Sequence, residues 1–337
     1  MEQETKRRRT ELSSTFERSE QEALSTCSRD GYFGDSSTAI ASNATGEPRI
    51  VLGSNYGEQS VGKNMVINED DAKQLEGCKG RYEGKVVIVT GGASGIGEGC
   101  VRVFFEADAK VVICDRNEEK GNALMTELNS QGKIGSALFL KADVSKGAEL
   151  QTLVDQTIKH YGRLDCIVNN AGWHPPPKYI DDFSLDESQD LMQLNFQSIF
   201  ALCKFSLPHL RKTQGNIINM SSLVGAFGQS KATTYAATKG ATTAFTKALA
   251  IDEARHRVRV NSVSPGNIWT PLWKAGADAE KDPTAAREAG ERVQVLGRMG
   301  TILEAGRLCL CIAADLTFTT GVDHILSGGA EIGYGVK

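Results

Sequence analysis

The sequence predicts an α/β fold with a doubly wound parallel sheet, preceded by a disordered N-terminal extension. Short apolar runs rich in β-branched residues alternate with helical stretches from residue 81 to residue 337. Such continuous apolar runs are typical of strands buried on both faces of a parallel sheet. With 337 residues, 35 glycines and 40% hydrophobic side chains, the chain is able to bury a large core without disulfides.

Composition excludes several classes of protein. The net charge of −4 offers no basic surplus for a nucleic-acid backbone. The eight cysteines are scattered, with no Cys-x-x-Cys pair, and the five histidines show no ligand spacing, so we expect reduced thiols and no metal site. No apolar run approaches membrane-spanning length, and the first 30 residues carry no apolar leader. We therefore expect a cytoplasmic protein without membrane contact.

Residues 1–80 differ from the rest of the chain in composition. They are rich in Ser, Thr, Glu, Gly and Asn, with few aromatic residues and no sustained periodicity, which predicts a disordered extension before a folded domain at 81–337. The run Lys6-Arg7-Arg8-Arg9 has two interpretations. It is either a solvated charge run or a contact for an import receptor or another acidic partner.

The first strand, residues 85–90, runs directly into a glycine-rich turn and then a helix. The turn reads Gly91-Gly92-Ala93-Ser94-Gly95-Ile96-Gly97. Glycines let the backbone approach a pyrophosphate, and the helix N-terminus supplies N–H donors. A second strand, 109–114, ends in Asp115, about 20 residues past the glycines, where a carboxylate binds the ribose hydroxyls of NAD. Asp115 would repel the 2′-phosphate of NADP, although the adjacent Arg116 is able to accommodate one. A Rossmann fold that binds NAD is the expectation.

The later elements continue the alternation. Asn169-Asn170-Ala171-Gly172 follows the fourth strand and suits a turn beneath a ligand, while the prolines at 175–177 exclude a helix just beyond it. Residues 267–291 are irregular or short-helical in pattern and are interpreted as a substrate lid. The sequence predicts helices at 118–130, 149–160, 186–212, 233–256 and 301–315, and further strands at 137–141, 164–168, 216–220, 257–263 and 322–326.

Ser222, Tyr235 and Lys239 form a candidate acid–base group. Tyr235 and Lys239 are separated by one helical turn, so both side chains lie on one face of a helix. A free tyrosine titrates near ~10, and an adjacent ammonium favours its phenolate form. The serine hydroxyl is then available to hold the oxygen of an alcohol or a carbonyl. An incidental Tyr-x-x-x-Lys pair on a surface helix is the alternative.

Taken together, these motifs resemble the short-chain dehydrogenase/reductases from about residue 81 onward. The residues that carry the resemblance are the glycine turn, Asp143, Asn169 to Gly172, Asn195, Ser222, Tyr235, Lys239 and Pro265-Gly266. The resemblance implies that Tyr235 is the general base and that Ser222 orients the substrate. It implies that Lys239 contacts the ribose and lowers the pKa of Tyr235. It also implies that Asn195 kinks its helix and holds a water that relays protons. For the cofactor it implies contacts from Gly91, Gly95, Ile96, Gly97, Asp115, Asp143, Val144, Asn170, Tyr235, Lys239, Pro265, Ile268 and Thr270.

Within the family, the chain is similar to a subgroup described as cytosolic, NAD-dependent and tetrameric. That subgroup is credited with oxidising the C17 hydroxyl of steroids such as estradiol and the C1 position of L-fucose. The resemblance rests on the segments 169–177, 221–226, 264–273 and 328–337. The expected substrate pocket contains His174, Ser222, Gln229, Trp273 and Tyr334. The alternatives are a dinucleotide-binding sensor without catalysis and a scaffold that acts through residues 1–80.

Overall fold

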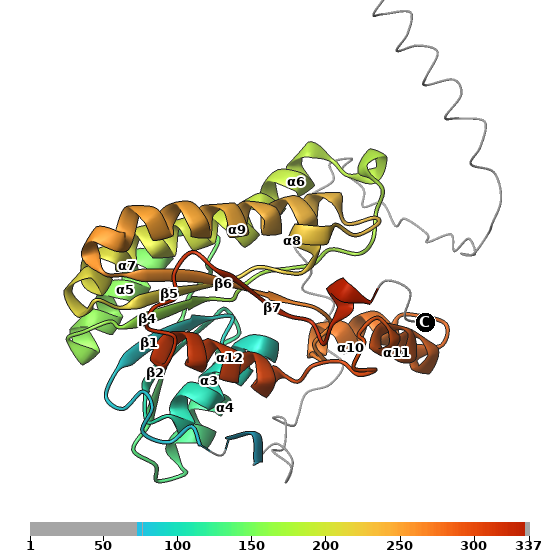
Figure 1. Ribbon diagram of the computed structural model, residues 1–337. Coiled ribbons are helices and arrows are strands. Elements are labelled where there is room, and N and C mark those ends of the chain that lie inside the picture. Colours follow the sequence, from blue (N-terminus) through green and yellow to red (C-terminus); the bar gives the residue numbers. More distant parts are fainter. Residues whose placement is uncertain (1–72, 76, 334–337) are drawn as a thin grey trace, which may run out of the picture. The chain divides into compact units, whose positions relative to one another are not determined.

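The computed structural model describes residues 73–75 and 77–333 of the chain (Figure 1). Most of the predicted extension, including the basic run Lys6-Arg7-Arg8-Arg9, lies outside the described residues, as does Tyr334. None of the helices in the described ranges is both long and apolar enough to cross a membrane.

The described residues contain one sheet of seven strands in the order β3-β2-β1-β4-β5-β6-β7, and every neighbouring pair is parallel. The order runs outward in both directions from β1 and β4, and sheets of this kind bind ligands at the carboxyl ends of the two strands where the order reverses. This confirms the predicted doubly wound parallel sheet. The strands are β1 (Val86–Thr90), β2 (Lys110–Asp115), β3 (Ser136–Lys141), β4 (Cys166–Asn169), β5 (Asn216–Met220), β6 (Arg259–Pro265) and β7 (Asp323–Leu326).

Helices cover both faces of the sheet (Figure 1). Val87 and Val89 of β1 belong to the apolar core on one face, and Val86 and Ile88 belong to the core on the other. Successive side chains of a strand point to opposite faces, which explains why the strand is apolar throughout. The helices are α3 (Gly95–Glu106), α4 (Glu118–Asn129) and α12 (Ile302–Ala314) on the first face, and α5 (Gly147–Tyr161), α7 (Ser198–Thr213) and α9 (Thr233–Glu253) on the second.

Shorter helices lie beyond the carboxyl ends of the strands (Figure 1). They are α6 (Leu185–Met192), α8 (Val224–Phe227), α10 (Pro271–Asp278) and α11 (Pro283–Arg292). The predicted lid therefore consists of two helices, α10 and α11. Each begins with a proline after a capping side chain, Thr270 or Asp282, whose oxygen accepts a backbone N–H.

Helices α3 and α12 cross at very short range. A Cβ atom added to Gly99 would lie 2.1 Å from the carbonyl oxygen of Ile302, so only glycine fits there. This contact fixes the start of α12 relative to the helix that follows the glycine turn.

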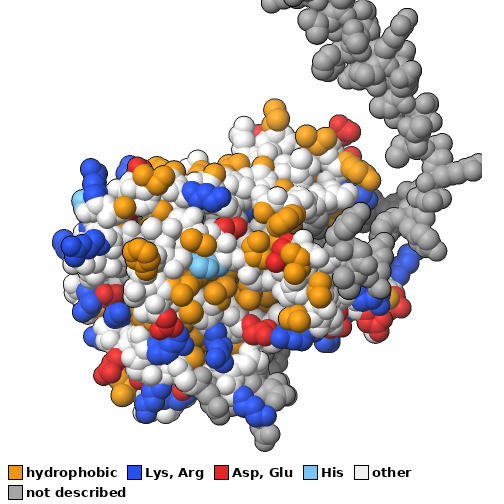
Figure 2. Space-filling model, in the orientation of Figure 1, with side chains coloured by type: hydrophobic (Ala, Val, Ile, Leu, Met, Phe, Trp, Pro, Cys, Tyr) orange, Lys and Arg blue, Asp and Glu red, His pale blue; other side chains and the backbone are white. Residues whose placement is uncertain are grey.

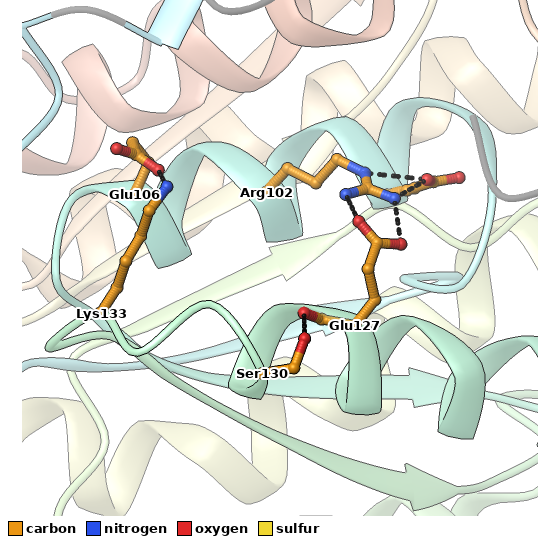
Figure 3. Close-up of polar contacts among 6 residues, drawn as sticks. Arg102, Glu106, Glu127, Ser130 and Lys133 are labelled. Carbon is orange, nitrogen blue, oxygen red and sulfur yellow. Dashed lines mark hydrogen bonds and ion pairs between the residues drawn. The ribbon is translucent and has the colours of Figure 1, made fainter. Parts of the chain in front are cut away.

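A buried arginine joins α3 to α4 (Figure 3). Arg102 is 2% exposed, and its guanidinium donates to Glu98 on its own helix and, through both terminal nitrogens, to Glu127 on α4. Lys133 and Glu106 form a second, more exposed ion pair nearby. Because the Arg102 charge is buried, both carboxylates are needed to compensate its lost hydration.

The folded unit includes residues before Arg81. Leu75 packs against the apolar core, the Cys78 side chain is fully buried in it, and Arg81 forms an ion pair with Asp315. Residues 75 and 78 were expected to belong to the extension. Their burial shows that the end of that segment packs on the domain, a contact that the polar composition of residues 1–80 obscured.

Candidate active site

The glycine turn lies between the carboxyl end of β1 and helix α3. Gly91 and Gly95 have positive φ angles of 62° and 58°, which side chains with a Cβ atom rarely adopt. A Cβ atom added to Gly97 would lie 2.0 Å from the carbonyl oxygen of Gly91, so the turn closes tightly on the helix. Ser94 makes no side-chain cap, and the first N–H groups of a helix lack intrahelical partners. Ile96 follows in that first turn, so the backbone of the turn and helix start fits an anion such as a pyrophosphate.

Asp115 ends β2 beside this turn. One of its carboxylate oxygens accepts the N–H of Ala93 at 3.1 Å, and the other accepts the N–H of Asn117 at 2.9 Å. Each carboxylate oxygen has further lone pairs, so the group is also able to accept hydrogen bonds from hydroxyl groups. Arg116 is exposed on the surface next to it.

The end of β3 adds two more predicted residues. The Val144 side chain is 8% exposed. Asp143 accepts hydrogen bonds from the backbone and the hydroxyl of Ser145 at 3.0 and 2.7 Å. Burial acts to raise the pKa of Asp143, but these hydrogen bonds and nearby cations outweigh it and lower the pKa. Both residues line the same edge of the sheet as Asp115.

Asn170 holds the turn from the neighbouring strand. Its side-chain amide donates to the carbonyl of Thr90 at 2.9 Å, and its backbone N–H donates to the Thr90 hydroxyl at 3.0 Å. The Thr90 hydroxyl also accepts the N–H of Ala171 at 3.1 Å. Sequence reasoning missed Thr90; its signal is a hydroxyl residue at the end of an otherwise apolar strand.

Tyr235 and Lys239 share one face of α9, next to Ser222 at the end of β5. The Lys239 ammonium donates to the carbonyl of Met220 at 2.8 Å and lies 5.7 Å from the centre of the Tyr235 ring. Lys239 is 4% exposed and Ser222 is 9% exposed. The structure therefore brings the three predicted residues together, from a strand end and from one helix turn.

Asn195 completes this group. It lies in a π-helical turn, Gln193–Gln197, between α6 and α7, so the predicted kink is a π-bulge. Its side chain bonds both the N–H and the carbonyl of Trp173, at 2.8 and 2.9 Å, and donates to the Thr238 hydroxyl at 3.2 Å. Sequence reasoning also missed Thr238, which lies one turn after Tyr235.

The pKa values differ from the expectation that Lys239 lowers that of Tyr235. Burial raises the pKa of Tyr235 to about 12, although a hydrogen bond with Ser222 opposes the shift. Burial lowers the pKa of Lys239 to about 8. Both shifts disfavour the charged form of a group removed from water. In this geometry desolvation outweighs the attraction between the two side chains, so the expectation was wrong for the site as it stands.

The predicted substrate residues are only partly assembled around Tyr235. The His174 ring lies 4.2 Å from the Tyr235 ring, centre to centre, and its Nδ1 atom donates to the carbonyl of Pro175 at 2.7 Å. Burial lowers the pKa of His174, and hydrogen bonds with Pro175 and Gln229 oppose that shift. His174 thus lies against the tyrosine, and the exposed Gln229 reaches His174. Trp273 is on α10, where it packs against Gly290 of α11.

The segment after β6 borders the glycine turn. Pro265 is the last residue of β6, Ile268 pairs with Gly300 in an isolated bridge, and Thr270 caps α10. A Cβ atom added to Gly95 would lie 3.6 Å from the side chain of Thr270, so this segment reaches the turn.

Known proteins share this arrangement. The sequence profile described as short chain dehydrogenase matches residues 85–281. L-fucose dehydrogenase of Bos taurus is 52% identical over 257 residues, which cover 76% of this chain and 93% of the relative. L-fucose dehydrogenase of Mus musculus is 51% identical, with 76% and 92% covered. The crystal structure of Cj0485 dehydrogenase superposes with a TM-score of 0.68 at 28% identity, covering 76% of this chain and 96% of that one. The chain is a dehydrogenase that belongs to the short chain dehydrogenase family.

Proposed function

We propose that this chain oxidises the C1 hydroxyl of L-fucose or a closely related sugar with NAD as the hydride acceptor. The observation that carries the proposal is the convergence of Ser222, Tyr235 and Lys239 beside the glycine turn, with His174 against the tyrosine ring. Relatives that share half of their residues with this chain are L-fucose dehydrogenases, which supports a sugar substrate.

Each side chain has one proposed role. The Ser222 hydroxyl holds the reacting oxygen, and Tyr235 takes its proton as the carbon is oxidised. Lys239 is a buried cation 5.7 Å from the centre of the Tyr235 ring, and its charge favours the phenolate against the effect of burial. Asn195 connects this group to the Trp173 backbone and so holds the adjoining loop. NAD, when bound, supplies the hydride acceptor.

NAD is the proposed cofactor because of Asp115. Its carboxylate is fixed at the glycine turn by Ala93 and retains lone pairs for two ribose hydroxyls. A 2′-phosphate at this position would meet a negative charge. Arg116, which is exposed, is a nearby cation that would favour NADP.

A 17-beta-hydroxysteroid such as estradiol is the second candidate. Trp269 and Trp273 lie 5.9 Å apart, ring centre to ring centre, and provide apolar area at the lid. A steroid needs a long apolar cleft, whereas a sugar needs several convergent polar groups. His174 against the tyrosine ring, and Gln229 bonded to His174, favour the sugar.

We also propose a homotetramer in the cytoplasm. Figure 2 shows hydrophobic side chains over the region of β7, an edge strand of the sheet on which Ile325 is 41% exposed. An uncovered apolar edge strand is a surface for self-association. The seven cysteines among the described residues are free thiols, which suits a reducing compartment. Light scattering on the purified chain would reveal a monomer if this assembly is wrong.

Steady-state kinetics test the proposal. The purified chain is assayed with NAD and NADP against L-fucose and estradiol, following the reduced nicotinamide. We expect turnover with NAD and L-fucose. Turnover only with NADP would contradict the role of Asp115, and turnover only with estradiol would select the steroid. Binding of NAD without turnover of either alcohol would favour a sensor over an enzyme for these substrates.

A further inference from the structure

The segment that precedes β1 contacts the start of α12 through Gln74. The side-chain oxygen of Gln74 accepts the hydroxyl of Thr301 at 2.8 Å, and its backbone carbonyl accepts the Arg307 guanidinium at 2.6 Å. Leu75 and Cys78 pack in the core just after it. Gln74 is therefore held on both sides, by α12 and by the buried residues that follow it.

The Thr301 hydroxyl takes part in two hydrogen bonds. It accepts the N–H of Glu304 at 3.1 Å as the N-cap of α12, while its single proton goes to Gln74. Helix α12 is itself fixed against α3 by the close Gly99 contact. The position of Thr301 thus depends on α12 from one side and on Gln74 from the other.

Thr301 follows directly on the bridge to the proposed cofactor segment. Gly300 donates its N–H to the carbonyl of Asn267 at 2.9 Å and accepts the N–H of Trp269 at 2.9 Å. Ile268 lies between these two partners, and Thr270, one residue further on, borders Gly95 of the glycine turn. A continuous set of contacts therefore joins Gln74 to the turn that we assign to the pyrophosphate.

The outer side of this segment borders a surface pocket. A cavity of about 380 Å³ lies there, lined by Trp269, Arg287, Thr301 and Gln74 among others. The Arg287 guanidinium lies over the Trp269 ring, 4.7 Å from its centre. Gln74 and Thr301 therefore line the same pocket as Trp269, which directly precedes Thr270.

We propose that Gln74 is a positioning residue for the cofactor, so that the residues just before the dehydrogenase sheet belong to the active-site scaffold. The inference rests on the proposed function, because it takes the segment from Asn267 to Thr270 as a cofactor contact. In this proposal, Gln74 touches neither the substrate nor the cofactor. It sets the register of Gly300 against Ile268 through the Thr301 hydroxyl.

The test uses variants of the full chain. Gln74→Met keeps the length of the side chain and removes the acceptor, whereas Gln74→Glu keeps an acceptor oxygen. Gln131→Met makes the same replacement at an exposed site after α4 and is the matched control. The Kd for NADH is measured by fluorescence, and KM for NAD and kcat are measured with L-fucose.

We expect Gln74→Met to raise Kd and KM about threefold to tenfold, the effect of one neutral hydrogen bond, with kcat unchanged. Gln74→Glu and Gln131→Met should match the parent chain. Arg307→Met, which frees the Gln74 carbonyl, should shift Kd in the same direction.

Three results would overturn the inference. The first is an unchanged Kd for NADH in Gln74→Met. The second is a Gln74→Glu variant that binds NADH as weakly as Gln74→Met. The third is a fall in kcat of Gln74→Met without a rise in KM, which indicates a smaller folded fraction. If the parent chain binds NADH but Gln74→Met behaves like it, only this inference fails. If the parent chain binds no dinucleotide, the proposed cofactor fails and the inference fails with it.

Discussion

The two halves of the sheet hold their functional residues in different ways. In the half that contains β1 to β4, side chains at strand ends bond backbone atoms of the neighbouring strand or of the turn that follows it, as Asn170 does with Thr90 and Asp115 with Ala93. In the other half, Tyr235 lies on a long helix and meets His174 from a loop after β4. Regular strand geometry therefore fixes the proposed cofactor side, whereas contacts between distant segments create the catalytic side.

Replacing Tyr235 with Phe tests this division most directly. The change removes the proposed base but keeps the ring that packs on His174. We expect kcat to fall by roughly 10²- to 10⁴-fold, the usual contribution of a positioned acid or base. The Kd for NADH, measured by fluorescence, should stay the same because the glycine turn is untouched. Turnover near the parent rate would show that another group accepts the proton.

Replacing Arg102 with Met tests the packing beneath the cofactor half. The change leaves Glu98 and Glu127 without the buried cation between α3 and α4. We expect a loss of about 3–5 kcal/mol in the free energy of unfolding, measured with denaturant. Arg287→Met, at a more exposed pair with Glu291, is the control and should cost less than about 1 kcal/mol. Equal losses of unfolding free energy would mean that the burial of Arg102 does not make its ion pairs more important for stability.

The pH dependence of stability tests the catalytic half, where burial shifts the pKa of Lys239. The pKa of Lys239 is about 8 in the folded chain, against an ordinary value of 10.5. The unfolded chain therefore binds more protons in this window, and the Lys239 contribution rises with pH from about 8 to about 10.5. It is lost again as pH falls through 8. Above pH 10 the raised pKa of Tyr235 acts in the opposite direction, because the unfolded tyrosine ionises first.

The measurement is the difference in unfolding free energy between the parent chain and Lys239→Met. We expect this difference to grow in favour of the parent between about pH 8 and pH 10, by up to about 3 kcal/mol. Other titrating groups cancel in the comparison. A difference that stays flat over this window would show that the Met220 hydrogen bond keeps the lysine at its ordinary pKa.

Replacing Asp115 with Asn tests the cofactor half with the smallest change in structure. Asparagine keeps an acceptor oxygen for the Ala93 N–H but removes the charge. We expect kcat/KM with NAD to fall roughly tenfold, as a charge-assisted hydrogen bond becomes a neutral one, while kcat/KM with NADP rises. If the ratio of the two cofactors does not change, Asp115 does not select between them.

Much of the cofactor half was predictable because its signals are local. A glycine turn follows an apolar strand, and an acidic residue ends the next strand, so residue types and spacing alone indicate that Gly91, Gly95, Gly97 and Asp115 lie together. The sheet confirms that they share one edge. The pair Tyr235 and Lys239 was equally accessible, since one helical turn aligns the two side chains.

Other features required the packed chain. Lys239 was expected to lower the pKa of Tyr235, but burial of both side chains has the larger effect. Likewise, Thr90 accepts a hydrogen bond from Asn170, and Thr238 accepts one from Asn195. No local motif predicts these two contacts. Composition alone assigned Cys78 to the extension, yet its side chain is fully buried.

The sequence by itself determined the parallel α/β fold, the glycine turn with its acidic partner, and the identity of the proposed catalytic residues. Periodicity and residue type are local patterns that span a few residues, so they can be recognised in a single sequence. Only the tertiary structure decided which distant segments meet Tyr235, how strongly burial shifts its pKa, and that Gln74 contacts Thr301 across more than 200 positions. Desolvation and long-range contacts depend on every element packed around a residue, and no local pattern encodes them.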